Sequence, residues 1–575
     1  MLKKRYLLLT GLVLSLAGSG CKRIETEPVD IYREDTLWDV QDRNANVASQ
    51  FLNDLYNYIP NGFARVGGNF FDAGTDDGVP SRTTQSVEFY TNGTISSTSN
   101  PDAYWGNSYA GIRKVNIFLA NIDKVPANAE TVKWWKAEAR FIRALMYFEL
   151  VKRYGGVPLI GDQIFTLQDD LSLSRNTYSE CVDYIVKECD AIVPDLRKET
   201  IAREYTDNDW GRIPRGAALA LKSRMLLYAA SPLFNGGGQV VPGSTDLNGY
   251  PNADPMRWQK ALDAAQEFLN AGYYTLRPSF SSVFLERKNT EIILAKQAVT
   301  NTTLETTNAP VGSAAPANSQ GLTSPSQNLV DAFPDANGRP ITDPATSYQA
   351  NNPYAGRDPR LLATVFTNGT GTSTSPVGSR WLGRNVELFE GGRDKPNTNG
   401  VQTRTGYYLR KFLGDFTSSS AYTNQTHNFP IFRFAEIKLN FAEALNERDR
   451  TPEAITQIID LRRRAGIQAG TDNRFGIPAG ISKDATRDLI RNERRIELAF
   501  EEHRFWDLRR WRIAETTLNG PLNGIKIVRT ATMPLTFTYE RTLVTNMVFQ
   551  PKLYYLPLPY DETTKNLNLM QNPGW

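Results

Sequence analysis

The stretch 493–511, ERRIELAFEEHRFWDLRRW, concentrates acids, arginines and large aromatic rings. Such a mixture suits either a catalytic cleft with paired carboxylates or an ion-pair network that supports the fold. Read as one helix, it places Ile496 and Phe500 on one apolar stripe, with Leu489 before them. The same helix brings opposite charges together in the pairs Glu497–Arg494, Glu501–Arg504 and Asp507–Arg510. Because each charge then has a local partner, we expect a structural role here and a packed His503 rather than a catalytic base.

Histidine and cysteine are too scarce for several common chemistries. Only His427 and His503 occur, so the chain has few histidines from which a Ser-His-Asp, Cys-His or multi-histidine zinc site could be built. Cys181 and Cys189 are eight residues apart, and a helix would separate them by about 12 Å along its axis, beyond disulfide reach. We expect two buried thiols, no catalytic residue, no cofactor and no metal. Glycosidase chemistry stays open only because the chain has 62 acidic residues.

Three aspartates stand close together in the sequence FFDAGTDDG. Asp72, Asp76 and Asp77 resemble part of a calcium-binding loop, but Gly74 occupies the second ligand position. A turn rich in capping aspartates is the preferred interpretation, with a structural calcium as the alternative. No Walker loop, dinucleotide fingerprint or GxSxG elbow occurs.

Aromatic residues in irregular segments are the better candidates for ligand contact. Residues 60–104 and 300–428 are rich in Gly, Asn, Ser, Thr and Pro, which is typical of functional or disordered loops. Sugar rings and peptide side chains stack on exposed aromatic faces, and nearby polar groups supply hydrogen bonds. The candidate ligand-binding residues are Tyr104, Trp105, Tyr348, Tyr354 and Trp381, with Arg82, Asn107 and Arg380 as polar neighbours.

Helices must position these loops. Apolar residues at three- and four-residue spacings predict a mainly α fold. The predicted helices are 47–59, one starting at 105, one containing 131–156, 175–193, 214–231, 256–271, 431–447, 452–465 and 482–511. Alternation of alanine with large residues in 214–231 and 256–271 indicates tetratricopeptide-type helical hairpins, in which small residues let two helices approach closely.

The first residues have the pattern of a secretory signal. Lys3, Lys4 and Arg5 precede an apolar run too short to span a membrane, and small residues lead to Cys21. We therefore expect a signal peptide at 1–20. Cys21 resembles the lipidated cysteine of a bacterial lipobox, with Gly18 where many such boxes have leucine. Residues 21–35 would then be the lipidated cysteine and a flexible tether, since acyl chains anchor a folded body firmly.

The overall charge gives no sign of a nucleic-acid partner. There are 65 Lys+Arg against 62 Asp+Glu, for a formal net charge of +3, and the mean hydropathy is -0.42. Strongly basic surfaces are the footprint of nucleic-acid binding, and none is indicated here. Amide-rich loops with plentiful aromatic rings suit uncharged polar ligands instead.

Ten segments in a fixed order resemble the SusD/RagB family, the outer-membrane nutrient-binding lipoproteins of Bacteroidetes-type bacteria. The resemblance covers essentially the whole mature chain, 36–575, with an N-terminal part of about 36–235 and a C-terminal part of about 256–575. The segments that carry it are 135–160, 211–235, 328–341, 357–366, 406–412, 432–447, 458–467, 489–511, 554–562 and 571–575.

The resemblance implies a SusD-like fold with tetratricopeptide-type hairpins and a loop-rich ligand-binding face. It further implies a non-enzymatic protein, lipid-anchored at the outer membrane and facing the cell exterior. Such a protein would capture a poly- or oligosaccharide and deliver it to a SusC-like TonB-dependent barrel. The alternatives are a peptide-binding RagB-type member, a lipid-anchored glycosidase and a purely structural adaptor. No binding residue is carried over, because the recognised segments are mainly scaffold.

Overall fold

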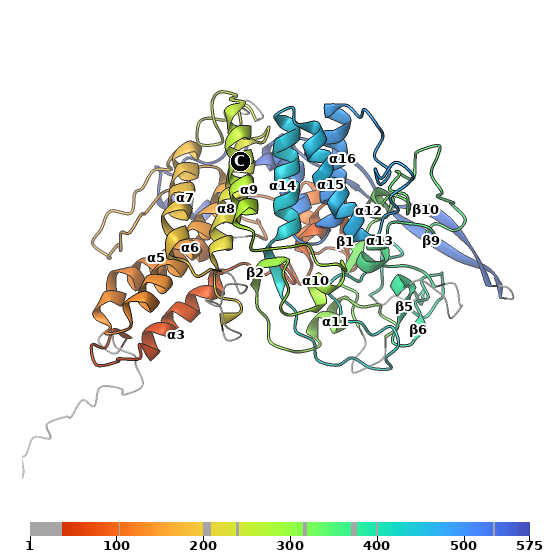
Figure 1. Ribbon diagram of the computed structural model, residues 1–575, viewed down its shortest axis with the longest axis horizontal. Coiled ribbons are helices and arrows are strands. Elements are labelled where there is room, and N and C mark those ends of the chain that lie inside the picture. Colours follow the sequence, from red (N-terminus) through yellow and green to blue (C-terminus); the bar gives the residue numbers. More distant parts are fainter. Residues whose placement is uncertain are drawn as a thin grey trace, which may run out of the picture.

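A computed structural model describes residues 37–102, 104–198, 209–236, 241–313, 319–369, 377–397, 401–532 and 535–575 (Figure 1). The predicted signal peptide, Cys21 and the tether lie outside these residues. The described chain is mainly helical, and its strands form small two-stranded sheets. The mainly α fold predicted from the periodicity is confirmed.

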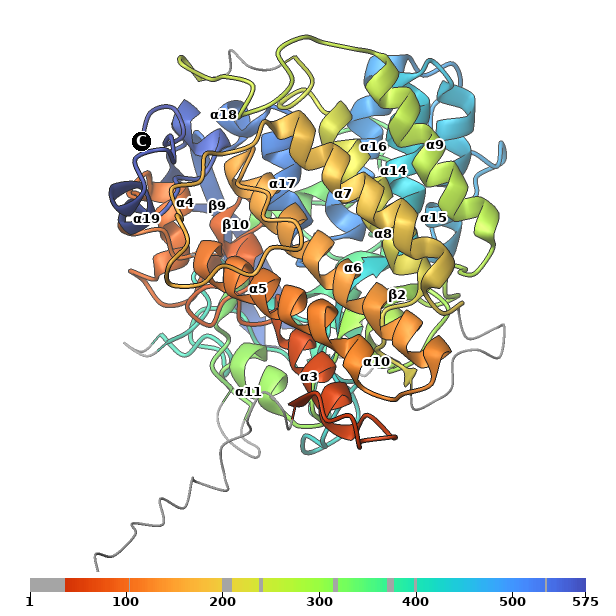
Figure 2. The same ribbon diagram turned by 90° about the vertical axis from the view of Figure 1, so that its left-hand side faces the viewer.

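The helices of the array are neighbours in chain order, as hairpins require. The bounds are α3 (Asn46–Leu55), α5 (Trp105–Asn121), α6 (Ala129–Tyr154), α7 (Tyr178–Ile192), α8 (Arg215–Ala230), α9 (Met256–Ala271), α14 (Phe434–Glu447), α15 (Thr451–Ala465), α16 (Lys483–Glu497) and α17 (His503–Arg510). Each of α5 to α8 packs on the next, α8 packs on α9, and α14 packs on α15 (Figure 2). Buried alanines such as Ala218, Ala261 and Ala265 allow the close approach of α8 and α9.

A long insertion interrupts the array and then returns to it. The chain leaves α9 at Gly272, builds the loop-rich body with residues 273–428, and re-enters as α14. Because α14 packs directly on α9, the array continues across the insertion (Figures 1 and 2). The loop-rich body therefore sits on a continuous helical scaffold.

Local chemistry sets the helix ends. Thr177 and Glu180 form a capping box that starts α7, in which the Thr177 backbone N–H donates to the Glu180 carboxylate at 2.8 Å. Gly155 ends α6 with φ 79°, and a Cβ at this position would lie 2.3 Å from the Leu247 carbonyl oxygen. Glycine is therefore required where α6 gives way to the next loop.

Short helices and antiparallel strand pairs make up the remaining regular structure, within the loop-rich body and at the ends of the array helices. The short helices are η1 (Tyr56–Tyr58), η2 (Phe71–Gly74), η3 (Ser86–Glu88), α4 (Phe89–Asn92), η4 (Ile122–Lys124), η5 (Val193–Asp195), α10 (Ser282–Leu285), α11 (Thr303–Asn308), α12 (Gln327–Ala332), α13 (Pro359–Thr364), η8 (Val377–Ser379), α18 (Ala514–Thr517), η9 (Pro551–Tyr554) and α19 (Tyr560–Lys565). The paired strands are β1 (Gly78–Pro80) with β3 (Thr323–Pro325), β2 (Ile292–Lys296) with β8 (Phe429–Arg433), β4 (Val365–Phe366) with β7 (Tyr408–Leu409), β5 (Arg380–Trp381) with β6 (Arg384–Asn385), and β9 (Gly520–Thr532) with β10 (Leu535–Met547).

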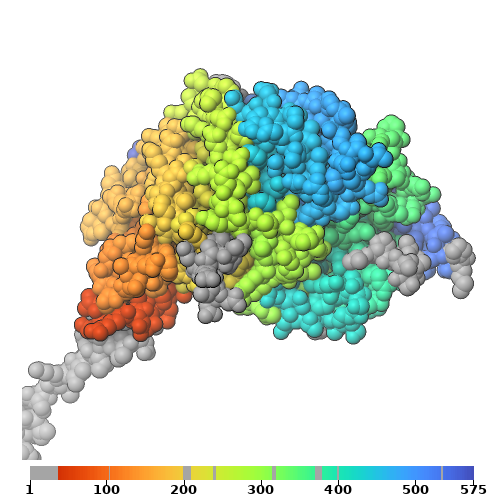
Figure 3. Space-filling view, in the orientation of Figure 1, coloured from red at the N-terminus to blue at the C-terminus, as the bar shows by residue number. Residues whose placement is uncertain are grey.

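The two large hydrophobic cores of the described residues correspond to the helical array and to the loop-rich body. The larger core lies among the array helices, and the second core fills the loop-rich body around Phe412 and Trp381. In Figure 3 the array forms one surface from orange to blue, and the yellow-green and teal segments of the loop-rich body lie below it. Pairing of β1 with β3 joins the two loop regions singled out in the sequence, 60–104 and 300–428.

The predicted single helix 482–511 is wrong. Helix α16 ends at Glu497, and α17 begins at His503 in a new direction. Phe500 and Glu502 between them adopt positive φ values of 61° and 65°, which a right-handed helix cannot contain. The backbone N–H of Phe500 donates to Asp72 Oδ1 at 3.0 Å, so a tertiary contact holds the break.

Candidate functional site

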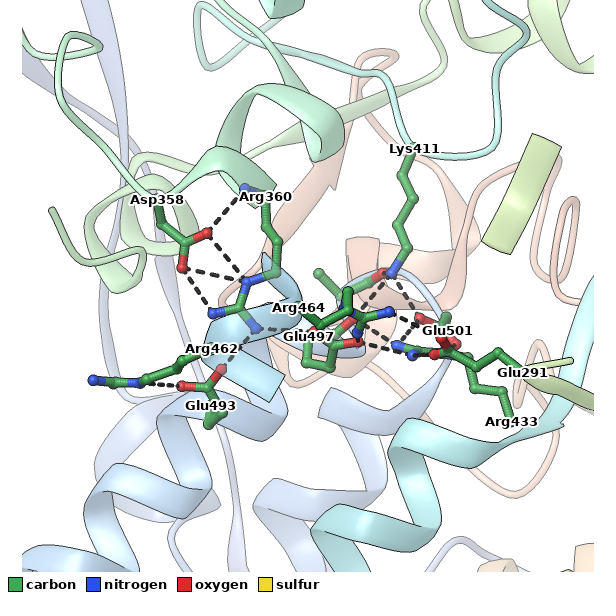
Figure 4. Close-up of polar contacts among 11 residues, drawn as sticks. Glu291, Asp358, Arg360, Lys411, Arg433, Arg462, Arg464, Glu493, Glu497 and Glu501 are labelled. Carbon is green, nitrogen blue, oxygen red and sulfur yellow. Dashed lines mark hydrogen bonds and ion pairs between the residues drawn. The ribbon is translucent and has the colours of Figure 1, made fainter. Parts of the chain in front are cut away.

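The charges of 493–511 face the interior of the protein, where the array meets the loop-rich body (Figure 4). Glu497 accepts from Arg433 Nη1 at 2.8 Å and from Arg360 Nη1 at 2.9 Å, and it also pairs with Arg464. Glu501 accepts from Arg433 and Lys411, each at 2.6 Å. These partners come from β8, α13, α15 and the 408–415 segment, so the charged side chains join distant segments.

Only one of the three expected local pairs forms. Asp507 does bind Arg510 at 2.7 Å, as predicted. Arg494 turns instead to Asp507 and Asn440, both at 2.7 Å, and Arg504 binds Asp76 at 2.8 Å. The predicted Glu497–Arg494 and Glu501–Arg504 pairs are wrong, because these buried charges pair with distant segments rather than along one helix.

This cluster lacks the properties of an acid–base site. Burial would raise the pKa of Glu497, but Arg464, Arg433 and Arg360 hold it well below its usual range. The Glu497 and Arg360 side chains are 0% exposed, so a substrate cannot reach them. Burial and neighbouring arginines likewise lower the pKa of His503 well below its usual range, leaving it neutral. The structural interpretation of the stretch and the packed His503 are both confirmed.

The three aspartates of the 72–77 turn also pair with protein groups. Asp76 and Asp77 bind Arg495 at 2.8 and 2.6 Å. Burial opposes ionisation of Asp76, but Arg495 and Arg504 lower its pKa to about 2. A turn is confirmed, but capping of its own short helix by an aspartate is not; Asp72 instead accepts from the Phe500 N–H between α16 and α17. Across the described residues, no group of His, Cys, Asp and Glu is arranged to hold a metal ion.

Two of the predicted ligand-contacting rings, Tyr104 and Trp105, are part of the helical core. Trp105 is the first residue of α5, is 5% exposed and packs against Tyr109 and Tyr154, with ring centroids 5.0 and 5.4 Å apart. The guanidinium of Arg153 lies 4.4 Å from the centre of the Tyr104 ring. The expectation of free stacking faces here is wrong, because helix packing covers both rings.

Trp381 and Tyr354 are buried in the second core. Trp381 is 0% exposed, and its Nε1–H donates to the Tyr422 hydroxyl at 3.0 Å. Tyr354 donates to the Tyr407 hydroxyl at 3.3 Å and packs edge-on against Tyr539. Composition marked their segments as loops, but those loops are folded tightly around their own aromatic residues. Neither ring can serve as a stacking surface in this conformation.

The other four predicted residues reach solvent. Arg82 is exposed and donates to Gln320 Oε1 at 2.9 Å across the joined loop regions. Asn107 is exposed on the first turn of α5, and Arg380 is half-buried on β5. Tyr348 is half-buried, with the Arg357 guanidinium 5.2 Å from its ring centre. These four remain candidate ligand contacts.

The β9–β10 hairpin adds aromatic residues that the sequence analysis missed. Phe537 and Tyr539 lie on the same face of β10 and are half-buried. Phe537 packs on Phe389 at 5.6 Å, and Tyr539 meets Tyr354 at 5.7 Å. Alternation of β-branched and aromatic residues across 525–544 was the available signal. We call the partly exposed rings of Tyr348, Phe537 and Tyr539 the hairpin platform: Tyr539 contacts both Phe537 and Tyr354, and Tyr348 lies near Tyr354.

A pocket with a volume of about 870 Å³ lies elsewhere, among α5, α6 and α7. Its charged residues pair with one another, as Lys136 does with Asp123 at 2.6 Å and Arg140 with Glu188 at 2.8 Å. No aromatic side chain lines it. A groove of this kind offers a sugar ring no stacking face.

The fold and this geometry define a class: a helical-repeat protein whose long insertion builds a separate, loop-rich face. The chain belongs to the SusD family. The SusD family model matches residues 290–575, and a second model, described as starch-binding associating with outer membrane, matches 34–227.

Known proteins resemble the chain along its length. SusD-like protein P2 of Formosa agariphila is 25% identical over all of both chains. A SusD-like protein of Bacteroides fragilis has a solved structure that is 26% identical, with a TM-score of 0.76 over 95% of this chain and 100% of that one. A second B. fragilis structure, named as a SusD-like carbohydrate binding protein, is 22% identical with a TM-score of 0.72 over 93% and 100%. The SusD-like fold predicted from the ten segments is confirmed.

Proposed function

We propose that this protein captures a poly- or oligosaccharide at the cell surface and delivers it to a SusC-like TonB-dependent outer-membrane transporter. The observation that carries the proposal is membership of a family whose matching model is described as starch-binding and outer-membrane-associated. A relative of the same fold is named as carbohydrate binding. The ligand face we propose combines the hairpin platform with Arg82, Asn107 and Arg380.

The chemistry of this face suits neutral sugars. Half-exposed rings stack on the apolar faces of pyranoses, while Arg82 and Arg380 present N–H donors to hydroxyl groups. Next to the platform, Arg541 pairs with Asp331, and both side chains remain partly exposed at 55% and 21%. This pair is neutral as a whole, and we propose that hydrogen bonding rather than net charge selects the ligand. We propose that the protein binds without turnover.

Calorimetry with a panel of polysaccharides, oligosaccharides and peptides tests the ligand class. We expect saturable binding of at least one glycan, with roughly a two- to tenfold loss of affinity in Tyr348→Ala, because one stacking contact contributes about 0.5–1.5 kcal/mol. Tyr560→Ala is the matched control, since Tyr560 is 52% exposed on α19 outside the proposed face. Peptide binding without glycan binding would favour a RagB-type function. Release of sugar products would favour a glycosidase.

Anchoring and transporter pairing form a separate part of the proposal. Within the described residues no helix is long and apolar enough to cross a membrane, so attachment would depend on a lipid at Cys21. We expect Cys21→Ser to move the protein from the membrane to the soluble fraction while glycan affinity is unchanged. Membrane retention of this variant would contradict the lipid anchor. Co-purification of the protein with a SusC-like barrel from the outer membrane would test the pairing.

A further inference from the structure

A second pocket lies in the loop-rich body, between α10, α13 and the segment 410–415. Its volume is about 360 Å³, the size of a small-molecule site for about one ring. Phe284, Phe412 and Leu413 form a buried apolar floor, while Leu285 and Leu362 are half-buried on its walls. The polar lining includes Arg410 and Asp415.

Arg410 is unusual because, among the described residues, its charge lacks a close partner. The residue is 7% exposed, and its Nη1 is buried without a hydrogen bond to any part of the chain that the structure describes. Its Nη2 lies 4.0 Å from Asp415 Oδ1, which is beyond hydrogen-bond range. The guanidinium rests between aromatic rings, 5.0 Å from the centre of Phe366 and 5.4 Å from that of Trp381.

Other buried cations of the same body are fully engaged. Arg360 binds carboxylate oxygens at 2.6 and 2.7 Å, and Lys411, the next residue after Arg410, binds Glu501 at 2.6 Å. Arg357 donates to several backbone carbonyls instead. A buried guanidinium without such acceptors loses its hydration, and no protein hydrogen bonds offset the cost of that loss. Support of the fold alone therefore does not explain why Nη1 of Arg410 is buried without a partner among the described residues.

We propose that this pocket binds a small ligand made of one ring and a carboxylate. The carboxylate would lie on Arg410, and the ring would lie against the apolar floor. A guanidinium matches a carboxylate with two parallel N–H donors. Asp415 is 64% exposed, and its Oδ1 accepts from the backbone N–H and the hydroxyl of Thr417 at 3.2 and 2.8 Å, so water and Thr417 stabilise its charge outside the pocket floor. Burial lowers the pKa of Arg410 to about 10, which still leaves it cationic at neutral pH. The site does not depend on the glycan function.

Two sources carry this chemistry: an aromatic acid and a uronic-acid sugar. Calorimetry with phenylacetate and with glucuronate distinguishes them, and phenylacetamide and glucose are the matched neutral probes. We expect saturable binding of at least one acid below about 10 mM and roughly tenfold to a hundredfold weaker binding of its neutral counterpart. Binding of neither acid, or equal binding of acid and neutral probe, would overturn the proposal.

Two variants locate the binding. Arg410→Met keeps a long side chain against the rings and removes the donors, so we expect loss of acid binding with little change in Tm. Ala363→Phe, on the half-buried wall of the pocket, should block the site while Arg410 stays in place. Acid affinity that survives either substitution would contradict the assignment. A lowered Tm in Arg410→Met together with unchanged affinity in Ala363→Phe would show that Arg410 only supports the fold.

Discussion

Glu497→Gln is the most informative single change in the interior charge cluster. The glutamine keeps the shape of the side chain but removes the negative charge shared by Arg360, Arg433 and Arg464. Three guanidinium groups would then surround a neutral amide with no access to water. Removing one partner of a buried pair destabilises a protein by about 3–5 kcal/mol. Each of the three arginines keeps another buried carboxylate, so we expect the lower part of this range.

The magnitude can be converted into a melting shift. With an unfolding entropy of about 2 cal/mol/K per residue over roughly 540 residues, this loss lowers Tm by about 3–4 °C. Circular dichroism on heating and tryptophan fluorescence in urea would both measure it. The low pKa of Glu497 adds a pH signature: its stabilisation is present above about pH 4.5 and lost as pH falls. The difference in unfolding free energy between the unsubstituted protein and Glu497→Gln should therefore become smaller in acid.

The matched control is Glu453→Gln on the surface. Glu453 pairs with Arg450 three residues earlier on the chain, and both side chains are about half exposed, at 53% and 45%. Solvent screens such a pair, so we expect no measurable change in Tm. If Glu497→Gln is no more destabilising than this control, the interior cluster does not hold the array and the loop-rich body together.

Three further predictions follow from buried groups and the platform. Burial and the charge of Asp77 raise the pKa of Asp72 to about 8, so the folded state keeps a proton that the unfolded state releases, and stability falls as pH rises from about 4 to 8. Asp72→Asn should remove this slope in urea titrations, and an unchanged slope would refute the assignment. Trp381→Ala should cost about 3–5 kcal/mol in urea unfolding because it empties a fully buried site, and a near-neutral effect would contradict the packing. Phe537→Ala should weaken glycan binding with a smaller loss of stability, since its ring is half-buried; intact affinity in calorimetry would exclude it from the platform.

The helices could be predicted from the sequence because their signal is local. The stripes in 214–231 and 256–271 repeat every three or four residues, and burial of one face enforces that period. Their capping residues are equally local, as at Thr177 and Gly155. The ten family segments likewise predicted the fold as a whole.

Long-range geometry could not be predicted in this way. The break at Phe500 depends on Asp72, more than 400 residues earlier, and Glu497 finds its arginines on three separate elements. Loop composition also gave no measure of burial: Trp105 begins α5 and is covered by helix packing, and the loop around Trp381 folds over its own aromatic residues. The candidate site therefore shifted from these indoles to Tyr348 and the hairpin.

The most direct test of the account is calorimetric titration of the purified protein with a glycan panel, repeated with Tyr348→Ala and Phe537→Ala. We expect saturable binding of one glycan class, no release of sugar products, and roughly two- to tenfold weaker binding in each variant. Binding of peptides alone, turnover of a glycan, or unchanged affinity in both variants would contradict it.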